Sequence, residues 1–227
     1  MNGSAHGRLV YVADPLCSWC YGFGPQLEDV LARHPDIALE LVMGGLRAGN
    51  TEAMSPAFRD MLRGHWDHVA QLTGLAFSDA IFAREGFVYD TEPPCRAVVA
   101  ARGLDPRRAL ALMKAIQGAF YRDGRDVTAP ATLADIAAGC GYDAGAFSAA
   151  LASPAMRAAT AADFARARGW GVTGFPTLAL ARGDALYLLT AGFATGDVVE
   201  ERLAEIERRL APADDQPAFD DRIPRRR

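Results

Sequence analysis

The feature that most constrains the fold is a change of character along the chain, which is mixed at first, all-helical over residues 51–155, and mixed again afterwards. Ahead of this block, residues 8–14 and 37–45 are apolar runs that predict strands. Between them, residues 24–35 repeat apolar side chains at helical spacing. A helical block inside an α/β chain indicates an inserted subdomain and not a tandem fusion.

The chain returns to mixed structure after the block. Residues 176–181 and 185–193 predict two strands, and the turn Gly183-Asp184 between them is typical of a hairpin. Residues 195–210 then predict a helix with one apolar face and one charged face.

The block itself predicts a series of helices, which its density of alanine favours. Helix starts are indicated at Asp105-Pro106, Thr132, Asp143 and Ser153-Pro154. A short extended piece is predicted at residues 86–92. The predicted helices are 55–74, 93–104, 105–124, 132–141, 143–153 and 155–169.

Composition narrows the class of protein. Half of the residues are hydrophobic and the formal net charge is −4, which is ordinary for a globular protein and does not indicate nucleic-acid binding. No window approaches the ~18 apolar residues of a membrane helix, and the N-terminus lacks the pattern of a secretory signal. We therefore expect a cytoplasmic protein without membrane partners. The sequence does not indicate its oligomeric state.

Two cysteines lie close together in "PLCSWCYGFGP", as Cys17 and Cys20. Structural disulfides are rare in the cytoplasm, so such a pair is expected to be catalytic or metal-binding. A structural zinc site needs four ligands at characteristic spacings. The remaining cysteines are single and distant, and His65 and His68 lie outside that spacing. No metal and no other cofactor is therefore predicted.

A redox pair suits the same residues. The strand ahead of the motif and the helix after it place the first sulfur at a helix N-terminus, where unpaired N–H groups and the helix dipole favour a thiolate. Cys17 is predicted to be the exposed nucleophile. Cys20, one turn into the helix, is predicted to resolve the mixed disulfide with the substrate.

A resemblance to a known family supports this interpretation. The segment 171–206 resembles the C-terminal half of thioredoxin, with Phe175-Pro176 at the position of the cis-proline loop. Pro25 matches the kinking proline of the helix that follows the motif in thioredoxin-like proteins. The strings "DPLCSWCYGFGP" and "YDTEPPCRAVVAAR" resemble the cytoplasmic FrnE-like branch of the DsbA family.

The resemblance implies an α/β (α+β) thioredoxin fold interrupted by an all-helical insertion. It assigns residues 8–50 and 156–211 to the two halves of the thioredoxin fold. Residues 51–155 form the insertion, and the polar, charge-patchy residues 212–227 are expected to be a flexible tail.

The family also implies which residues meet the substrate. The cis-proline loop is expected to lie against the cysteine pair, where Phe175 and Pro176 contact an extended substrate segment. Ser18 and Trp19 stand between the cysteines and are expected to contact substrate, although packing is an equal alternative for Trp19. Partners are protein or small-molecule thiols and disulfides, together with a cellular thiol reductant or oxidant.

Two other functions remain open on the same scaffold. A glutathione-dependent isomerase or transferase, of the 2-hydroxychromene-2-carboxylate isomerase or kappa class, typically carries a serine in place of the nucleophilic cysteine. The presence of both Cys17 and Cys20 favours a thiol–disulfide oxidoreductase of the protein-disulfide isomerase type instead. The third alternative is a redox-inert binding or metal-buffering protein.

Several other residues carry blander expectations. Cys95 and Cys140 are interpreted as small buried residues, and His65 and His68 as the surface of a helix. Tyr21 and Phe23 are predicted to pack against the insertion, and Arg96 to form a surface ion pair. No buried acid is placed near the cysteines, since Asp14 is near them in sequence only.

Overall fold

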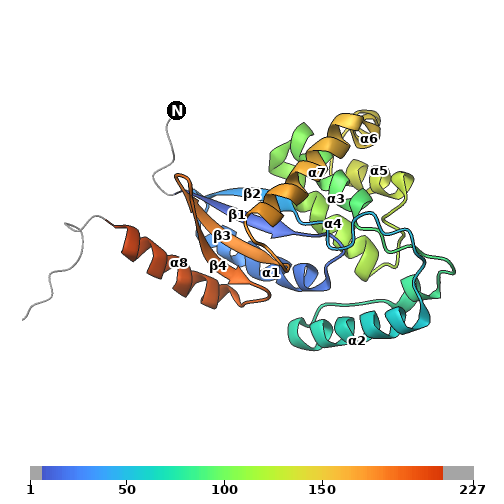
Figure 1. Ribbon diagram of the computed structural model, residues 1–227, viewed down its shortest axis with the longest axis horizontal. Helices are drawn as coiled ribbons and strands as arrows, with labels where there is room; N and C mark the ends of the chain where they lie inside the picture. The colour runs from blue at the N-terminus through green and yellow to red at the C-terminus, as the bar shows by residue number, and fades with distance from the viewer. Residues whose placement is uncertain (1–6, 212–227) are drawn as a thin grey trace, which may run out of the picture.

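The computed structural model describes residues 7–211, so the predicted tail at 212–227 lies outside the described residues. A four-stranded sheet in the order β2-β1-β3-β4 lies at its centre (Figure 1). The central strand β1 (Arg8–Ala13) pairs in parallel with β2 (Ala38–Met43). On its other side, β1 pairs antiparallel with β3 (Thr177–Arg182).

The hairpin partner β4 (Ala185–Ala191) completes the sheet. Its turn contains Gly183 at φ +56°, a left-handed conformation that favours glycine. The turn therefore forms where Gly183-Asp184 predicts it.

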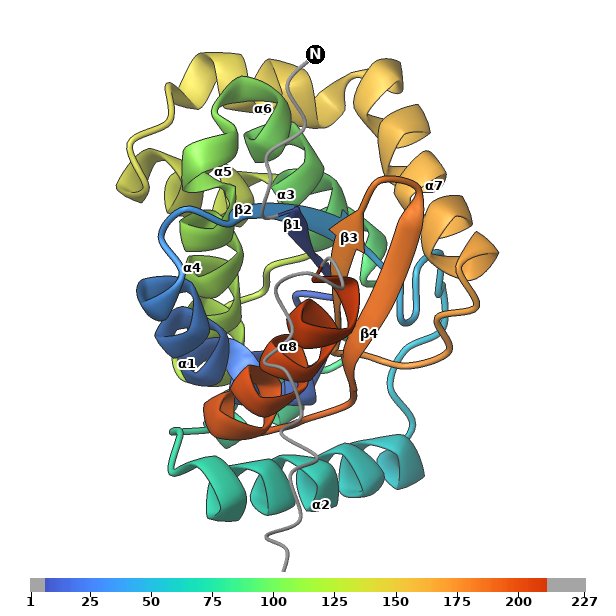
Figure 2. The ribbon, with the colours of Figure 1, turned by 90° about the vertical axis from the view of Figure 1, so that its left-hand side faces the viewer.

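Alternate side chains of β1 point to opposite faces of the sheet, and they are buried on both faces because helices cover both. Val10 and Val12 pack toward α7 (Pro154–Gly169). The opposite face packs against α1 (Ser18–Arg33) and α8 (Gly196–Leu210), which also contact each other (Figure 2). This arrangement confirms the expected thioredoxin-like fold.

The chain between β2 and α7 is helical apart from connecting loops. In Figures 1 and 2, α2 lies at the opposite end of the molecule from α5 and α6, where it packs against α1. The helices are α2 (Pro56–Thr73), α3 (Glu92–Leu104), α4 (Ala109–Tyr121), α5 (Pro130–Gly139) and α6 (Ala144–Ala152), with short 3-10 turns at η1 (Asp79–Ala83) and η2 (Pro106–Arg108).

Two elements of this block differ from expectation. The predicted helix at 105–124 begins as the turn η2, whose N-cap Asp105 accepts a hydrogen bond from the Arg107 amide, and only then becomes α4. The predicted extended piece at 86–92 contributes one isolated bridge between Val88 and Ala53, so it has too little pairing to form a strand.

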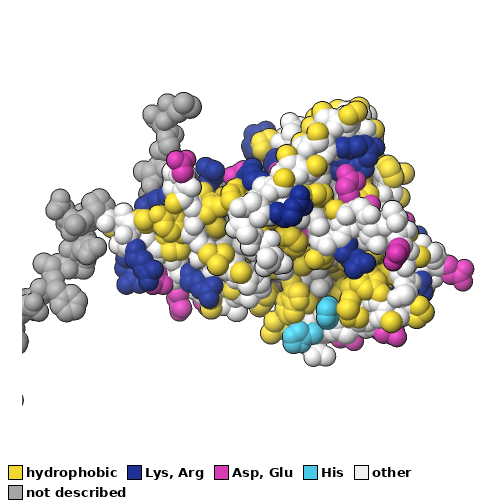
Figure 3. Space-filling model, viewed as in Figure 1, with side chains coloured by type: hydrophobic (Ala, Val, Ile, Leu, Met, Phe, Trp, Pro, Cys, Tyr) yellow, Lys and Arg dark blue, Asp and Glu magenta, His cyan; other side chains and the backbone are white. Residues whose placement is uncertain are grey.

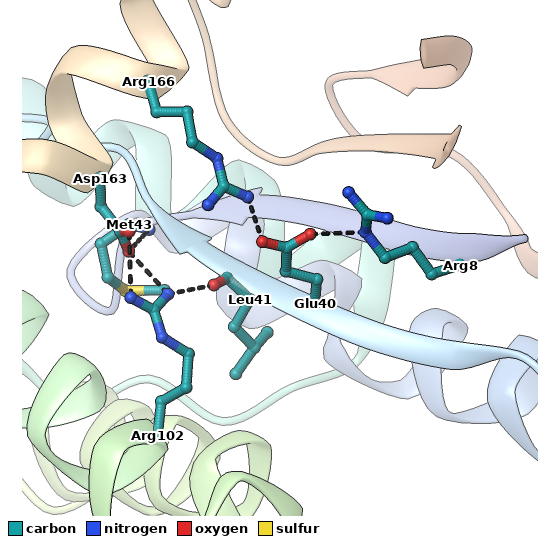
Figure 4. Close-up of polar contacts among 7 residues, drawn as sticks. All are labelled: Arg8, Glu40, Leu41, Met43, Arg102, Asp163 and Arg166. Atoms are coloured by element: carbon teal, nitrogen blue, oxygen red, sulfur yellow. Dashed lines mark hydrogen bonds and ion pairs between the residues drawn. The ribbon is translucent and has the colours of Figure 1, made fainter. Parts of the chain in front are cut away.

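A polar network joins α3 and α7 to the strand β2 (Figure 4). The buried Asp163 of α7 accepts hydrogen bonds from the Met43 amide at 3.0 Å and from both terminal nitrogens of Arg102, at 2.8 and 3.0 Å. Arg102 also donates to the carbonyl of Leu41. Buried charges need such compensation, so these contacts fix where α3 and α7 cross β2.

A second group of charges extends the polar network along β2. Glu40 accepts hydrogen bonds from Arg8, at 2.8 Å, and from Arg166 of α7 (Figure 4). The Glu40 side chain is more exposed than that of Asp163. The ion pairs of Glu40 are therefore expected to contribute less to stability than the ion pair between Asp163 and Arg102.

An aromatic cluster joins the block to α1. It is formed by Trp66, Phe77, Phe82, Phe120 and Tyr121. Trp66 is 2% exposed, and its ring centroid lies 4.6 Å from that of Phe82 and 5.0 Å from that of Tyr121. Tyr21 of α1 stacks on Tyr121 at 5.0 Å, as predicted for packing against the insertion.

Two packing predictions are wrong. Phe23 packs on Tyr11 of β1 and on Phe193 after β4, because it faces the sheet and not the helical block. Arg96 forms an ion pair with Glu92 at 3.0 Å, but it is 7% exposed and not on the surface. Its guanidinium is held inside because it also donates to the carbonyl of Leu151.

Within residues 7–211, no helix has both the length and the apolar character that crossing a membrane requires.

Candidate active site

Cys17 occupies the N-cap of α1, three residues after the buried Asp14 that follows β1. The amide of Cys17 donates to the carbonyl of Asp14 at 3.0 Å, which turns the chain from the strand into the helix. No side chain caps the first amides of α1. The Cys17 sulfur therefore lies at a helix N-terminus whose amides are free to face an anion, as the sequence predicts.

The loop ahead of β3 lies against this sulfur. The Cys17 thiol donates to the carbonyl oxygen of Phe175, with 3.5 Å between sulfur and oxygen, although the two residues are 158 positions apart. The Phe175–Pro176 peptide bond is cis. The predicted residues Cys17, Phe175 and Pro176 thus come together at one place.

Gly44, at the end of β2, makes room for this loop. A Cβ atom on Gly44 would lie 2.0 Å from two ring atoms of Phe175, closer than real contacts allow. The Phe175 ring therefore lies directly against the backbone of Gly44, with no side chain between them.

A cavity of about 420 Å³ opens between the cysteine motif and α2. Its lining includes Cys17, Ser18 and Trp19 on one side, and Phe175 beside them. Figure 3 shows hydrophobic side chains gathered between α2 and the rest of the molecule, with histidines on α2 at one end of this region. The volume falls within the range of small-molecule sites.

Cys17 is less exposed than the sequence suggests. It was expected to be an exposed nucleophile, but only 6% of it is accessible. The loop ahead of β3 lies against its sulfur, and α2 forms the opposite wall of the cavity that Cys17 lines. Access to the sulfur is through this cavity.

Trp19 both packs and lines the cavity. Its ring meets that of His68 on α2 edge-on, with 5.4 Å between centroids, and that of Phe193 at 5.9 Å. His65 and His68 are exposed on α2 as predicted, and His65 also lines the cavity. The two alternatives for Trp19 are therefore not exclusive.

Cys20 lies one turn into α1 and is fully buried. Burial raises the pKa of the Cys20 thiol well above its ordinary value, and the neighbouring Cys17 sulfur raises it further. All four cysteines are free thiols in the structure. The pair thus consists of one sulfur that borders a cavity and one that water does not reach.

Asp14 is the residue that the sequence analysis missed. It is fully buried and accepts hydrogen bonds from the amides of Leu16, at 2.8 Å, and Leu46, at 2.7 Å. Burial raises the pKa of the Asp14 carboxyl, and the two amides offset this only in part. A carboxylate directly after a strand in which only Arg8 is charged was the signal that could have identified it.

Cys95 lies next to Asp14. Its thiol donates to the Asp14 carboxylate, with 3.4 Å between sulfur and oxygen, and it is fully buried as predicted. Burial, followed by the Asp14 charge, raises the pKa of the Cys95 thiol. Cys140 is only half-buried, because it ends α5 near the surface. No cluster of three or more His, Cys, Asp or Glu side chains suited to a metal occurs among residues 7–211.

Comparison with known proteins places the chain among DsbA-like proteins. The model of the DSBA-like thioredoxin domain family matches residues 8–206. A protein from Nitrosomonas europaea, proposed to be a protein disulfide isomerase, is 32% identical, with a TM-score of 0.84 over 90% of this chain and 99% of that chain. A search of the curated proteins finds no match.

Two further structures differ in what they show. The cytosolic disulfide reductase DsbM from Pseudomonas aeruginosa is 32% identical, with a TM-score of 0.71 over 89% of this chain and 98% of that chain, and it has also been solved with glutathione. A 2-hydroxychromene-2-carboxylate isomerase is 17% identical, with a TM-score of 0.58 over 89% of this chain and 97% of that chain. The latter likeness concerns the fold alone.

Proposed function

Because the chain belongs to the DsbA-like thioredoxin domain family, we propose that it is a thiol–disulfide oxidoreductase in which Cys17 is the nucleophile and Cys20 the resolving thiol. The observation that carries the proposal is the position of the Cys17 sulfur. It lies at the N-terminus of α1, 3.5 Å from the Phe175 carbonyl, on the wall of a cavity.

The proposed reaction begins from the reduced pair. The Cys17 thiolate attacks one sulfur of a substrate disulfide, so a bond forms between Cys17 and that sulfur while the other substrate sulfur leaves as a thiolate. Cys20 then gives up its proton, which the released substrate thiolate takes, and attacks the Cys17 sulfur. The Cys17–Cys20 disulfide forms, the second substrate thiolate leaves, and two electrons have passed to the substrate.

The two cysteines are suited to these different roles. Cys17 borders the cavity from which a disulfide would approach, and α1 presents its free amides to the developing anion. The raised pKa keeps Cys20 as a thiol until the mixed disulfide has formed, which protects it from reaction with other disulfides. Phe175 is proposed to hold the substrate segment, and Ser18 and Trp19 to contact it from the cavity wall.

We also propose a cytoplasmic location and a cellular thiol as the electron donor. The likeness to the cytosolic disulfide reductase DsbM, and that protein's structure with glutathione, support both suggestions. With such a donor, one thiolate attacks Cys17 and releases Cys20, and a second thiolate then attacks the donor sulfur and releases Cys17. The two donor thiols leave joined as a disulfide, and the overall activity is that of a disulfide reductase.

Two variants test the assignment of roles. Cys17→Ser is expected to abolish the reduction of bis(2-hydroxyethyl) disulfide and of insulin, because no nucleophile remains at the cavity. Cys20→Ser is expected to accumulate a mixed disulfide at Cys17, which intact-protein mass spectrometry detects. Cys140→Ser is the matched control and should leave both readouts unchanged. Full activity in Cys17→Ser would refute the proposal.

The glutathione-dependent isomerase or transferase gives a different result in the same experiment. Such an enzyme holds the glutathione sulfur without forming a disulfide, so Cys20→Ser would accumulate no adduct, and an isomerase or transferase activity, assayed beside the disulfide reduction, would survive Cys17→Ser. A redox-inert protein would show no disulfide turnover in any variant.

A further inference from the structure

Arg47 is held at the cavity by its backbone. The preceding amide, that of Leu46, donates to the buried Asp14 at 2.7 Å. The Arg47 amide donates to the hydroxyl of Thr91, which is also fully buried, at 3.1 Å. These two contacts fix the loop after β2, so the arginine starts from a rigid position on the cavity wall.

The guanidinium of Arg47 has no anionic partner in the part of the chain that the structure describes. It lies over the ring of Phe58, 4.3 Å from the centroid, and the side chain is exposed. None of the ion pairs among residues 7–211 includes it. Stacking on an aromatic ring orients a guanidinium while leaving its edge free for hydrogen bonds.

The remaining lining makes this charge significant. The cavity is walled mainly by apolar and aromatic side chains, and it contains no carboxylate in its lining. It therefore combines a thiol, an apolar surface and one fixed cation. The planar guanidinium matches a carboxylate in two parallel hydrogen bonds.

We propose that Arg47 binds the carboxylate of a low-molecular-weight disulfide whose sulfur reacts with Cys17. This deepens the proposed function and rests on it, because it identifies the carboxylate-bearing small thiol that exchanges electrons at the same site; the disulfide of that thiol forms the same Cys17 adduct in the reverse of the donor reaction. Glutathione disulfide is the probe that carries such a carboxylate. The Cys17 thiolate attacks one of its sulfurs, a Cys17–glutathione disulfide forms, and the other glutathione leaves as a thiolate. Arg47 holds the glutathionyl group that remains.

The experiment compares two disulfides with the reduced protein. Oxidation of the cysteine pair is measured at increasing concentrations of glutathione disulfide or of the uncharged bis(2-hydroxyethyl) disulfide, by quenching and mass-tagging the remaining thiols. For Arg47→Ala, the half-saturating concentration of glutathione disulfide is expected to rise roughly tenfold, equivalent to about 1.4 kcal/mol. The limiting rate, and the reaction with the uncharged disulfide, should stay the same.

Two other variants serve as controls. Arg63→Ala removes an arginine that also lies over a phenylalanine, Phe82, at 4.8 Å, but that does not line the cavity. It should react with both disulfides as the unmodified protein does. His65→Ala removes the other basic side chain of the cavity lining, and it should raise the half-saturating concentration less than Arg47→Ala does.

The outcomes separate this inference from the proposed function. If Arg47→Ala slows both disulfides equally or neither, or if His65→Ala has the larger effect, the carboxylate site is refuted while the oxidoreductase remains. If the unmodified protein oxidises with the uncharged disulfide but not with glutathione disulfide, the inference is likewise refuted. If it reacts with neither, the proposed function fails and the inference fails with it.

Discussion

Charged side chains join the helical block to the sheet at β2, whereas aromatic rings join it to α1 beside the cavity. The polar network buries ions that gain little net stability but accept only one arrangement of α3 and α7. The aromatic cluster buries large apolar rings, which stabilises strongly and tolerates small shifts. The difference suggests that the network sets the position of the block and the cluster holds it there.

Trp66→Ala is expected to have the largest effect on stability. The substitution leaves a cavity among the rings of the aromatic cluster, so the free energy of unfolding should fall by about 3–5 kcal/mol. Chemical denaturation followed by circular dichroism measures this loss. Trp170→Ala is the matched control, because Trp170 is 37% exposed, and its loss should stay below about 1 kcal/mol.

Asp163→Ala breaks the polar network at its buried centre. Arg102 and the Met43 amide lose their acceptor, so we expect a loss of about 3 kcal/mol. The double variant Asp163→Leu, Arg102→Met should recover much of that stability, because no unpaired charge then remains. A double variant as unstable as the single one would show that the ions themselves stabilise the fold.

Asp14→Asn tests the buried acid beside the cysteine motif. Because burial raises the pKa of Asp14 in the folded protein, the folded state binds more protons than the unfolded state. Its contribution is complete below the ordinary pKa of about 3.9 and is lost as the pH rises through the raised value, by at most about 1.4 kcal/mol per pH unit. When the free energy of unfolding is measured from pH 4 upward, the unsubstituted protein should show this decline and Asp14→Asn should not.

Glu40→Gln is expected to have the smallest effect and the opposite pH dependence. Burial tends to raise the pKa of Glu40, but the hydrogen bonds from Arg166 and Arg8 outweigh it, so the pKa is lowered. Its contribution is present above the ordinary pKa of about 4.3 and is lost as the pH falls. At neutral pH, the variant should lose less than about 1 kcal/mol. A loss as large as that of Asp163→Ala would contradict the expectation that the more exposed ion pairs of Glu40 stabilise the fold less than the buried ion pair of Asp163.

Local patterns were sufficient to predict most of the elements. The apolar strands, the Gly183-Asp184 turn and most of the helices depend on neighbouring residues, and these were placed within a few positions. The helix predicted at 24–35 is the exception, because it begins earlier, at Ser18. The cysteine motif and Phe175-Pro176 could be connected only through a family resemblance, because spacing does not tell which loop returns to a helix 158 residues away.

The errors concern contacts between distant segments. Cys17 was expected to be exposed because nothing in its own segment shows that the loop at Phe175 lies against its sulfur. Phe23 and Arg96 were assigned to the wrong environments for the same reason, and Asp14 was passed over because its partners Leu46 and Cys95 come later in the chain.

The pairing of β1 with β3 has a consequence for the newly made polypeptide. Tyr11 faces Leu178 across that pair, and the loop at Phe175, which lies against the Cys17 sulfur, comes directly before β3. Because this loop follows Cys17 by 158 residues, it is translated long after the two cysteines. Until then both sulfurs meet whatever oxidants the surroundings contain. A chain interrupted before residue 175 would be a simple dithiol, with no loop to present a partner to it.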